Sequence, residues 1–202
     1  MKTVKSAASV GRPREFDPAE ALDKALKIFW QKGYEGTSLT DLTESMGINR
    51  PSLYAAFGNK EALFRKALDR YAETAGAMTR AALAEPTARG VVEQLLRKTA
   101  EGLGNPSNPR GCLAVQAALA CGEEADPVKK ELIARRCASE KAVRDRLERA
   151  KAEGDLPASS DPGALAGFIA AVQQGMSVKA SSGASGEELK AIAEVALQAW
   201  PV

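Results

Sequence analysis

Apolar side chains recur at intervals of three and four residues along most of the chain, which is the periodicity of an amphipathic α-helix. The first such run extends from Leu22 to Phe29. Asp17-Pro18 before the run supplies an N-cap and a first-turn proline, and Gly33 after it supplies a C-terminal glycine cap. No segment alternates apolar and polar residues as a half-buried strand does. The pattern therefore predicts an all-α protein.

The same signals predict about nine helices. Ser38, Asn49 and Asn59 stand at the N-cap positions of the second, third and fourth helices. The glycine- and proline-rich segment 104–111 is predicted to be a loop, and the short apolar helix that follows it is expected to be buried. The predicted helices span about 18–32, 39–46, 50–57, 60–83, 89–102, 112–121, 126–154, 162–180 and 187–200.

The distribution of charge divides the chain into three parts. Residues 1–14 contain four basic residues, no acid and no apolar period, and are predicted to form a flexible basic arm. Residues 15–60 contain the first three helices, which are expected to form a small head. Residues 61–202 are expected to form a larger helical domain, and from residue 85 onward charges of both signs alternate as on solvated helix faces.

The composition excludes several classes of protein. The 202 residues contain no histidine, which removes the most frequent general base and most zinc and haem sites. A glycine-rich phosphate loop and a nucleophile elbow are also absent from the sequence, so no catalytic site, metal site or cofactor is expected. No apolar run is long enough to cross a bilayer, and the N-terminus does not resemble a secretory signal. Three scattered cysteines favour a reduced, cytoplasmic setting.

Residues 37–61 contain the most informative pattern, which is two short helices joined by a turn at Gly47. On a helical wheel, Leu53, Ala56 and Phe57 of the second helix face inward, and the opposite face is small or polar. Helix, turn and helix at this spacing can lay the second helix in the major groove of DNA. We therefore predict that the head binds double-stranded DNA.

The predicted DNA contacts have side chains that suit this role. Arg50 is suited to a bidentate contact with guanine, and the Pro51 ring to a thymine methyl group. Polar side chains near them, and free N–H groups at the start of the preceding helix, suit phosphate oxygens, and arginines of the arm suit the minor groove. The predicted contacts are Arg12 and Arg14 in the arm, Thr37, Ser38 and Thr40 at the start of the first of the two helices, and Asn49, Arg50, Pro51, Ser52, Tyr54 and Lys60 around the second.

The stretch from Thr37 to Leu63 contains Met-Gly-Ile, Ser-Leu-Tyr-Ala-Ala-Phe and Gly-Asn-Lys-Glu in order, and it resembles the N-terminal signature of the TetR/AcrR family of transcriptional repressors. Residues 25–36 resemble the first helix of that family, and the resemblance covers about residues 15–70. It implies an all-helical homodimer with a DNA-binding head that recognises a palindromic operator. It also implies a larger C-terminal domain that binds a small molecule.

The resemblance assigns roles by position. Ala56 departs from the family, which often has His or Tyr at this position, so the resemblance assigns no phosphate contact to residue 56. The matched positions are Thr40, Arg50, Pro51, Ser52 and Tyr54, which fall where the family contacts DNA, and Lys60, which falls at its phosphate-binding lysine.

The family also dimerises through its last two long helices. The ninth predicted helix has an apolar stripe from Leu189 to Trp200 that must be covered, and the eighth is rich in Ala and Gly. A four-helix interface between two copies accounts for both features, and a core within one chain is the alternative.

An effector pocket is expected among the fourth to eighth helices, although apolar residues at helical spacing are more often plain core. Cys112 follows Arg110-Gly111 at the predicted start of the sixth helix, where a positive helix end favours a thiolate. Segment 110–113 also resembles a motif in a branch of the family with electrophile-responsive members. The pocket candidates are Tyr71, Met78, Cys112, Leu113, Gln116, Phe168, Val172 and Gln173, and the effector is unknown.

Two alternatives remain open for the chain as a whole. One is a regulator that uses Cys112 as a sensor of oxidants or electrophiles. The other is a helical protein-interaction module that does not bind DNA, which a salt-dependent affinity for DNA would exclude.

Overall fold

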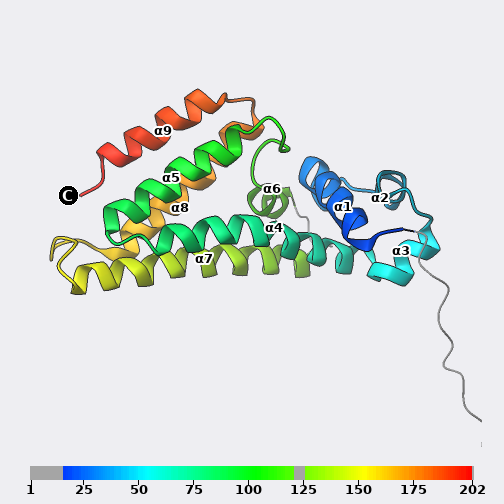
Figure 1. Ribbon diagram of the computed structural model, residues 1–202, viewed down its shortest axis with the longest axis horizontal. Coiled ribbons are helices and arrows are strands. Elements are labelled where there is room, and N and C mark those ends of the chain that lie inside the picture. Colours follow the sequence, from blue (N-terminus) through cyan, green and yellow to red (C-terminus); the bar gives the residue numbers. More distant parts are fainter. Residues whose placement is uncertain (1–15, 121–125, 202) are drawn as a thin grey trace, which may run out of the picture.

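The computed structural model describes residues 16–120 and 126–201, and every regular element within them is an α-helix (Figure 1). This confirms the predicted all-α fold. The predicted arm with Arg12 and Arg14 lies outside the described residues, as does Cys121. The nine helices of the described residues are α1 (Pro18–Lys32), α2 (Leu39–Met46), α3 (Arg50–Phe57), α4 (Lys60–Leu83), α5 (Ala88–Gly104), α6 (Leu113–Ala120), α7 (Asp126–Ala152), α8 (Pro162–Ser181) and α9 (Gly186–Gln198).

Side-chain caps begin the helices of the head where the sequence predicts them. The Asn49 side-chain oxygen accepts a hydrogen bond from the Ser52 N–H at 2.8 Å, so Asn49 holds the start of α3. The Asn59 oxygen caps α4 in the same way at 2.8 Å, and Ser38 begins α2 with a capping box. Each cap satisfies an N–H that the first helical turn leaves unpaired, which fixes where the helix starts.

Some helix bounds differ from the predicted ones by one or two residues. α5 spans 88–104 instead of 89–102, α7 ends at Ala152 instead of 154, and α9 covers 186–198 instead of 187–200. The earlier start of α5 has a local cause, because the Thr87 hydroxyl accepts from the Gly90 N–H at 3.0 Å and acts as an N-cap. Trp200 lies beyond the end of α9 but is still buried in the core.

The long helices α4 and α7 run alongside each other and connect the two ends of the molecule (Figure 1). The head, α1 to α3, lies at one end. α5, α8 and α9 pack together at the other end, and α6 lies between them and the head (Figure 1). None of the helices within 16–120 and 126–201 is long and apolar enough to span a membrane.

Two apolar cores hold this arrangement together. The head core contains Phe29, Leu53 and Phe64, which are fully buried and come from α1, α3 and α4. Leu113 of α6 and Leu132 of α7 belong to the same core. The second core lies among α5, α7, α8 and α9. Because α6 and α7 contribute side chains to the head core, a displacement of either helix changes the packing of the head.

The apolar stripe of α9 is covered within the chain, so of the two explanations given for this stripe the core within one chain applies. Leu189, Ala193 and Leu197 are buried in the second core, where α9 packs against α5. The pattern in the sequence shows that one face of a helix is buried, but it does not show which chain buries it. The exposed apolar residues of α8 and α9 are different ones and include Phe168 and Val195.

Candidate nucleic-acid interface

The turn between α2 and α3 holds these two helices in a fixed relation. Gly47 adopts a φ of 70° and a ψ of 31°, a left-handed conformation that glycine adopts without strain. Its N–H donates to the Glu44 carbonyl at 3.2 Å and closes the last turn of α2. On the inner face of α3, Leu53 and Phe57 are buried, as the helical wheel predicts.

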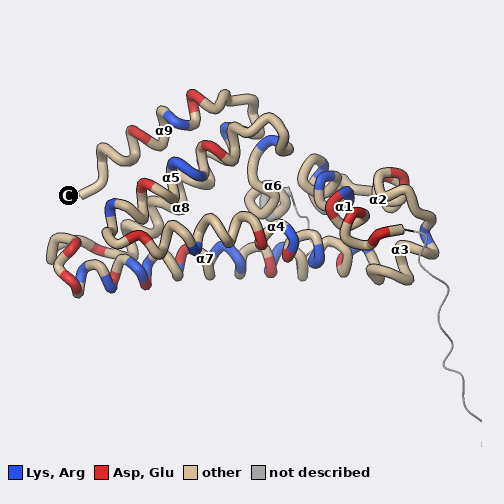
Figure 2. The backbone as a smooth tube through the Cα atoms, in the orientation of Figure 1, with Lys and Arg blue, Asp and Glu red and all other residues tan. Residues whose placement is uncertain are grey.

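The outer face of α3 is exposed and carries little charge. Pro51, Tyr54 and Ala55 are exposed, Tyr54 by 49%, whereas Ser52 is half-buried. Arg50 is the only charged residue of α3, so the tube of this helix is mostly tan in Figure 2. A face of small and hydrogen-bonding side chains without an acid can approach the DNA backbone and the base edges closely.

Arg50 reaches across the turn to α2. Its Nη2 donates to the Thr40 hydroxyl oxygen at 3.2 Å, and both residues are exposed. The structure therefore brings together two of the predicted DNA contacts, one from each helix, on a single surface.

The start of α2 differs from the prediction, because the N–H groups of Thr37 and Ser38 are already paired. Thr37 is buried, its hydroxyl donates to the Gly33 carbonyl at 2.6 Å, and its N–H donates to the Tyr34 carbonyl at 3.4 Å. The Ser38 N–H donates to the Asp41 carboxylate at 2.9 Å. Thr37 is therefore a structural residue inside the head, and neither Thr37 nor Ser38 offers a free N–H to a phosphate.

The carboxylate of Asp41 also changes the electrostatics of this helix start. The Lys32 ammonium donates to Asp41 at 2.5 Å. This bond, followed by those from Ser38, holds the pKa of Asp41 well below its ordinary value. Asp41 is therefore ionised at neutral pH and offsets the positive end of α2 that would otherwise attract a phosphate.

Lys60 lies at the first position of α4, over the ring of Tyr34. Its Nζ is 4.6 Å from the ring centroid, a cation–π arrangement that the sequence alone does not predict. Burial lowers the pKa of Lys60, and the negative charge of Glu35 opposes this shift. The ammonium is thereby held at the positive end of α4, in the position where a phosphate contact is predicted.

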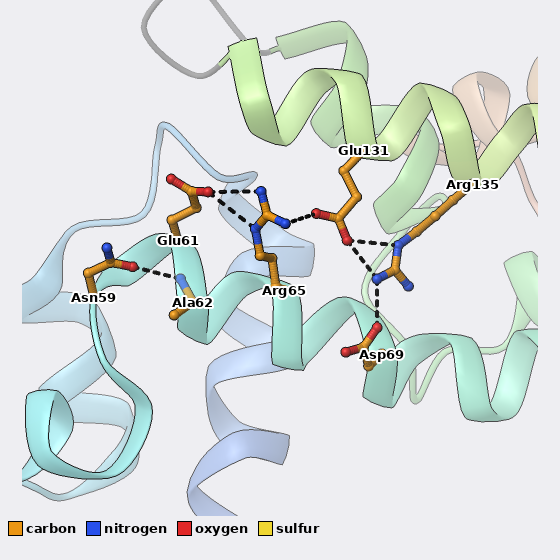
Figure 3. Close-up of polar contacts among 7 residues, drawn as sticks. All are labelled: Asn59, Glu61, Ala62, Arg65, Asp69, Glu131 and Arg135. Carbon is orange, nitrogen blue, oxygen red and sulfur yellow. Dashed lines mark hydrogen bonds and ion pairs between the residues drawn. The ribbon is translucent and has the colours of Figure 1, made fainter.

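Figure 3 shows a set of ion pairs that joins the first half of α4 to α7. Arg65 of α4 pairs with Glu131 of α7 at 2.8 Å. Glu131 also pairs with Arg135 at 2.7 Å, and Arg135 pairs with Asp69 of α4 at 2.6 Å. From residue 85 onward the alternating charges are expected from the sequence to lie on solvated faces, but Glu131 and Arg135 of α7 pair with residues of the neighbouring α4.

A second link joins the head to the rest of the chain at the turn before α6. The Trp30 Nε1–H of α1 donates to the Gly111 carbonyl at 2.8 Å, and the Trp30 ring meets Tyr71 edge-on with 4.8 Å between centroids. The Tyr71 hydroxyl donates to the Cys112 sulfur at 3.3 Å. The Cys112 N–H donates to the Ser177 hydroxyl of α8 at 2.8 Å. The head and α8 are thus both held by residues 110–112.

The predicted pocket residues do not share one place. Met78 and Phe168 are 38% and 40% exposed. Gln173 on α8 donates to the Thr99 hydroxyl at 2.8 Å, and Val172 is half-buried against the second core. The remaining four lie around the turn before α6 and are Tyr71, Cys112, Leu113 and Gln116.

The environment of Tyr71 fixes its protonation state. Burial raises the pKa of Tyr71 well above its usual value, and the neighbouring Cys112 raises it further. The hydroxyl therefore stays protonated at neutral pH and acts as the donor to the sulfur.

A cavity of about 150 Å³ lies elsewhere, between α7 and α8. This volume is below the range of about 300–1,000 Å³ that small-molecule sites usually have. Its lining residues are Cys137, Glu140, Lys141, Arg144 and Gly163, none of which belongs to the predicted pocket.

Comparison with known proteins matches both parts of the chain. Residues 21–67 match the bacterial regulatory proteins of the tetR family, and residues 86–195 match the tetracyclin repressor-like C-terminal domain. The chain is 38% identical over 195 residues to the HTH-type transcriptional repressor ComR of Escherichia coli strain K12. This alignment covers 96% of this chain and 93% of that protein. It is 31% identical over 202 residues to the HTH-type transcriptional repressor BdcR of the same strain, and this alignment covers 98% of this chain and 96% of that protein.

A solved structure extends the comparison to three dimensions. The TetR family transcriptional regulator CifR, determined as a cysteine mutant complexed with 26-base-pair double-strand operator DNA, superimposes with a TM-score of 0.90 and 47% identity. The alignment covers 95% of this chain and all of that chain.

Proposed function

Because this chain belongs to the TetR family of bacterial regulatory proteins, we propose that it is a transcriptional repressor that binds operator DNA as a homodimer and leaves it when a small molecule binds. The observation that carries this proposal is the exposed outer face of α3, whose only charge is Arg50. Two relatives named as repressors and a structural relative bound to operator DNA support it.

On DNA, α3 enters the major groove and the residues around it hold the backbone. Arg50 contacts a guanine edge, and Pro51 packs against a thymine methyl group. Lys60 contacts a phosphate from the start of α4, where the helix end is positive. Further contacts come from Thr40, Asn49, Ser52 and Tyr54, and from Arg12 and Arg14 of the arm in the minor groove.

The homodimer forms through the exposed faces of the last two helices, α8 and α9. An exposed and uncharged stripe runs along α8 at helical spacing, and Val195 of α9 is 65% exposed. Such a stripe is what a symmetric, tightly packed helix interface buries. The stripe of α8 consists of Ala164, Phe168, Ala171, Gly175 and Val178.

Effector binding acts on the links between the head and the rest of the chain. Residues 110–112 hold α1 and α8 together, and Glu131 holds α4 against α7. A ligand that displaces α6 or α7 therefore shifts the head and changes the distance between the two α3 helices of a dimer. That distance must match about one turn of DNA. The ligand must bind the DNA-free state more tightly, since otherwise it shifts no equilibrium.

These assignments give each part of the chain a separate function. Residues 15–60 form the DNA-binding head, and residues 61–202 bind the effector and dimerise. The role requires no catalytic step, and a repressor acts where the chromosome lies, which in bacteria is the cytoplasm.

A second candidate mechanism uses Cys112 in place of an effector pocket. Its sulfur accepts from Tyr71 in the turn that links the head to α8. When the thiolate attacks iodoacetamide, an S–C bond forms, the C–I bond breaks with release of iodide, and the thiol proton is lost to solvent. The added group lies beside Tyr71 and disturbs this turn. Iodoacetamide should then release DNA from the wild type but not from Cys112→Ser, in which the exposed Cys137 remains as an internal control. Equal release from both proteins contradicts this mechanism.

Selection of bound sequences from a pool of random duplexes tests the proposed function. We expect enrichment of an inverted repeat whose half-sites lie about one DNA turn apart. The affinity for the enriched duplex should fall by orders of magnitude between about 50 mM and 200 mM salt. A folded, dimeric protein that enriches no sequence contradicts the proposal.

A further inference from the structure

Arg50 occupies a position that offers a cation no stabilising partner of opposite charge. It is the first residue of α3, where the helix dipole leaves a partial positive charge, and α3 contains no acid. Among the ion pairs of the described residues Arg50 takes part in none, whereas arginines such as Arg65, Arg97 and Arg135 each pair with a carboxylate. The charge of Arg50 thus contributes little to folding and is available to an acceptor outside the chain.

The hydrogen-bond acceptor that Arg50 does have is held in place. Thr40 lies in the first turn of α2, and its hydroxyl oxygen accepts from Nη2 of Arg50 at 3.2 Å. The side chain of threonine is branched at Cβ, which restricts its χ1 angle. The helix that carries it is fixed by the capping box at Ser38 and by the left-handed turn at Gly47. Thr40 therefore offers Arg50 a nearly stationary acceptor.

We propose that Thr40 is a positioning residue that orients Arg50 toward one guanine in each half-site, an inference that rests on the proposed DNA-binding function. The guanidinium is planar and carries five donors, so one donor directed at Thr40 restricts the rotation of the whole plane. Donors that do not face Thr40 remain available for O6 and N7 of a guanine. The Thr40 hydroxyl accepts from Arg50 and keeps its own hydrogen for an acceptor on the DNA.

Positioning has a signature that other roles of Thr40 do not share. Loss of a phosphate contact weakens binding to all duplexes by the same factor, because phosphates carry no sequence information. Loss of a structural contact lowers the unfolding temperature. Loss of positioning reduces discrimination at one base pair, the pair that Arg50 reads.

The test uses the duplex that the wild type selects and a series in which each guanine of both half-sites is replaced in turn. Dissociation constants are measured by fluorescence anisotropy for the wild type, Arg50→Ala, Thr40→Val and Thr40→Ser. One replacement should weaken wild-type binding by about five- to a hundred-fold, and Arg50→Ala should be insensitive to it. The guanine ratio is the dissociation constant for the replaced duplex divided by that for the selected duplex. Thr40→Val should reduce this ratio by about three-fold or more, and Thr40→Ser, which keeps the hydroxyl, should restore it.

A double-mutant cycle completes the test. In the Arg50→Ala background, Thr40→Val should produce no further change in the guanine ratio, because the two residues act as a unit. Thr40→Val that keeps the wild-type ratio, or that weakens all duplexes equally, overturns the inference. So does a selected site at which Arg50→Ala alters no guanine preference. If the wild type selects no sequence, the proposed function itself fails, and this inference fails with it.

Discussion

The indole nitrogen of Trp30 donates a hydrogen bond to the Gly111 carbonyl at 2.8 Å, across 81 residues of sequence. Gly111 has a φ of 81°, and a Cβ at this position would overlap the side-chain amide of Gln116. That amide donates to the Arg110 carbonyl at 2.9 Å. The turn that presents a carbonyl to the head therefore requires glycine at position 111.

Replacement of Gly111 should cost more stability than replacement of a glycine with the same backbone angle in open space. Gly154 also has a φ of 81°, and a Cβ there meets nothing within 4 Å. Gly154→Ala should lower the free energy of unfolding by about 1 kcal/mol, the cost of a left-handed alanine. Gly111→Ala should cost about 1 kcal/mol more, because Gln116 must give up its hydrogen bond. Urea unfolding measures both, and equal losses would contradict this description of the turn.

The ion pairs between α4 and α7 should contribute more than an exposed pair on α7 alone. The Glu131 side chain is 20% exposed and binds both Arg65 and Arg135. Glu131→Gln should therefore lower the free energy of unfolding by about 1 kcal/mol, and less at high salt. Asp145→Asn, which breaks the exposed pair with Lys141, should cost less than about 0.5 kcal/mol. Similar costs for the two variants would show that Glu131 does not hold the helices together.

A charge on the outer face of α8 should dissociate the homodimer. Phe168→Glu places a carboxylate in the proposed interface and should raise the dimer dissociation constant by about ten-fold or more. Ile133→Glu is the matched control, because Ile133 of α7 is exposed to a similar extent and lies on another helix. Sedimentation velocity over a concentration series distinguishes the two. A dimer that survives Phe168→Glu places the interface elsewhere.

The contribution of Asp41 to stability should depend on pH. Its hydrogen bonds to Lys32 and Ser38 hold its pKa below the unfolded value, so the unfolded chain binds the proton more readily. The contribution is therefore complete above about pH 5 and is lost as the pH falls below the unfolded pKa near 4. Asp41→Asn should lower the unfolding temperature at pH 7, and the gap to the wild type should narrow toward pH 2. A gap that stays constant would show that the charge of Asp41 does not matter.

The helix starts of the head could be predicted because their causes are local. Ser38, Asn49 and Asn59 each cap an N–H three residues along the chain, and such pairs are visible in the sequence. The inward face of α3 follows from the helical period in the same way. The role of Thr37 has a local cause as well, since its hydroxyl donates to the carbonyl four residues earlier, but the prediction named this threonine as a DNA contact.

The links between the parts of the molecule could not be predicted, because they join residues far apart in the sequence. In the sequence, Trp30 is indistinguishable from an ordinary core residue of α1, because its partner Gly111 is brought near only by the fold. In the sequence, Arg135 is one of many charges on a solvated helix, and its ion pair with Asp69 follows only from the packing of α7 against α4. The stripe of α9 was predicted to be covered, but the covering element, α5, follows only from the packing of the whole chain.

The central claim, that the outer face of α3 reads DNA, is tested most directly by fluorescence anisotropy with the selected duplex and a scrambled one. The proteins are the wild type, the double variant Arg50→Ala/Tyr54→Ala, and Arg149→Ala at the far end of α7 as a control. The wild type and Arg149→Ala should prefer the selected duplex by about a thousand-fold or more. The double variant should remain a folded dimer and lose this preference. A double variant that keeps the wild-type preference contradicts the claim.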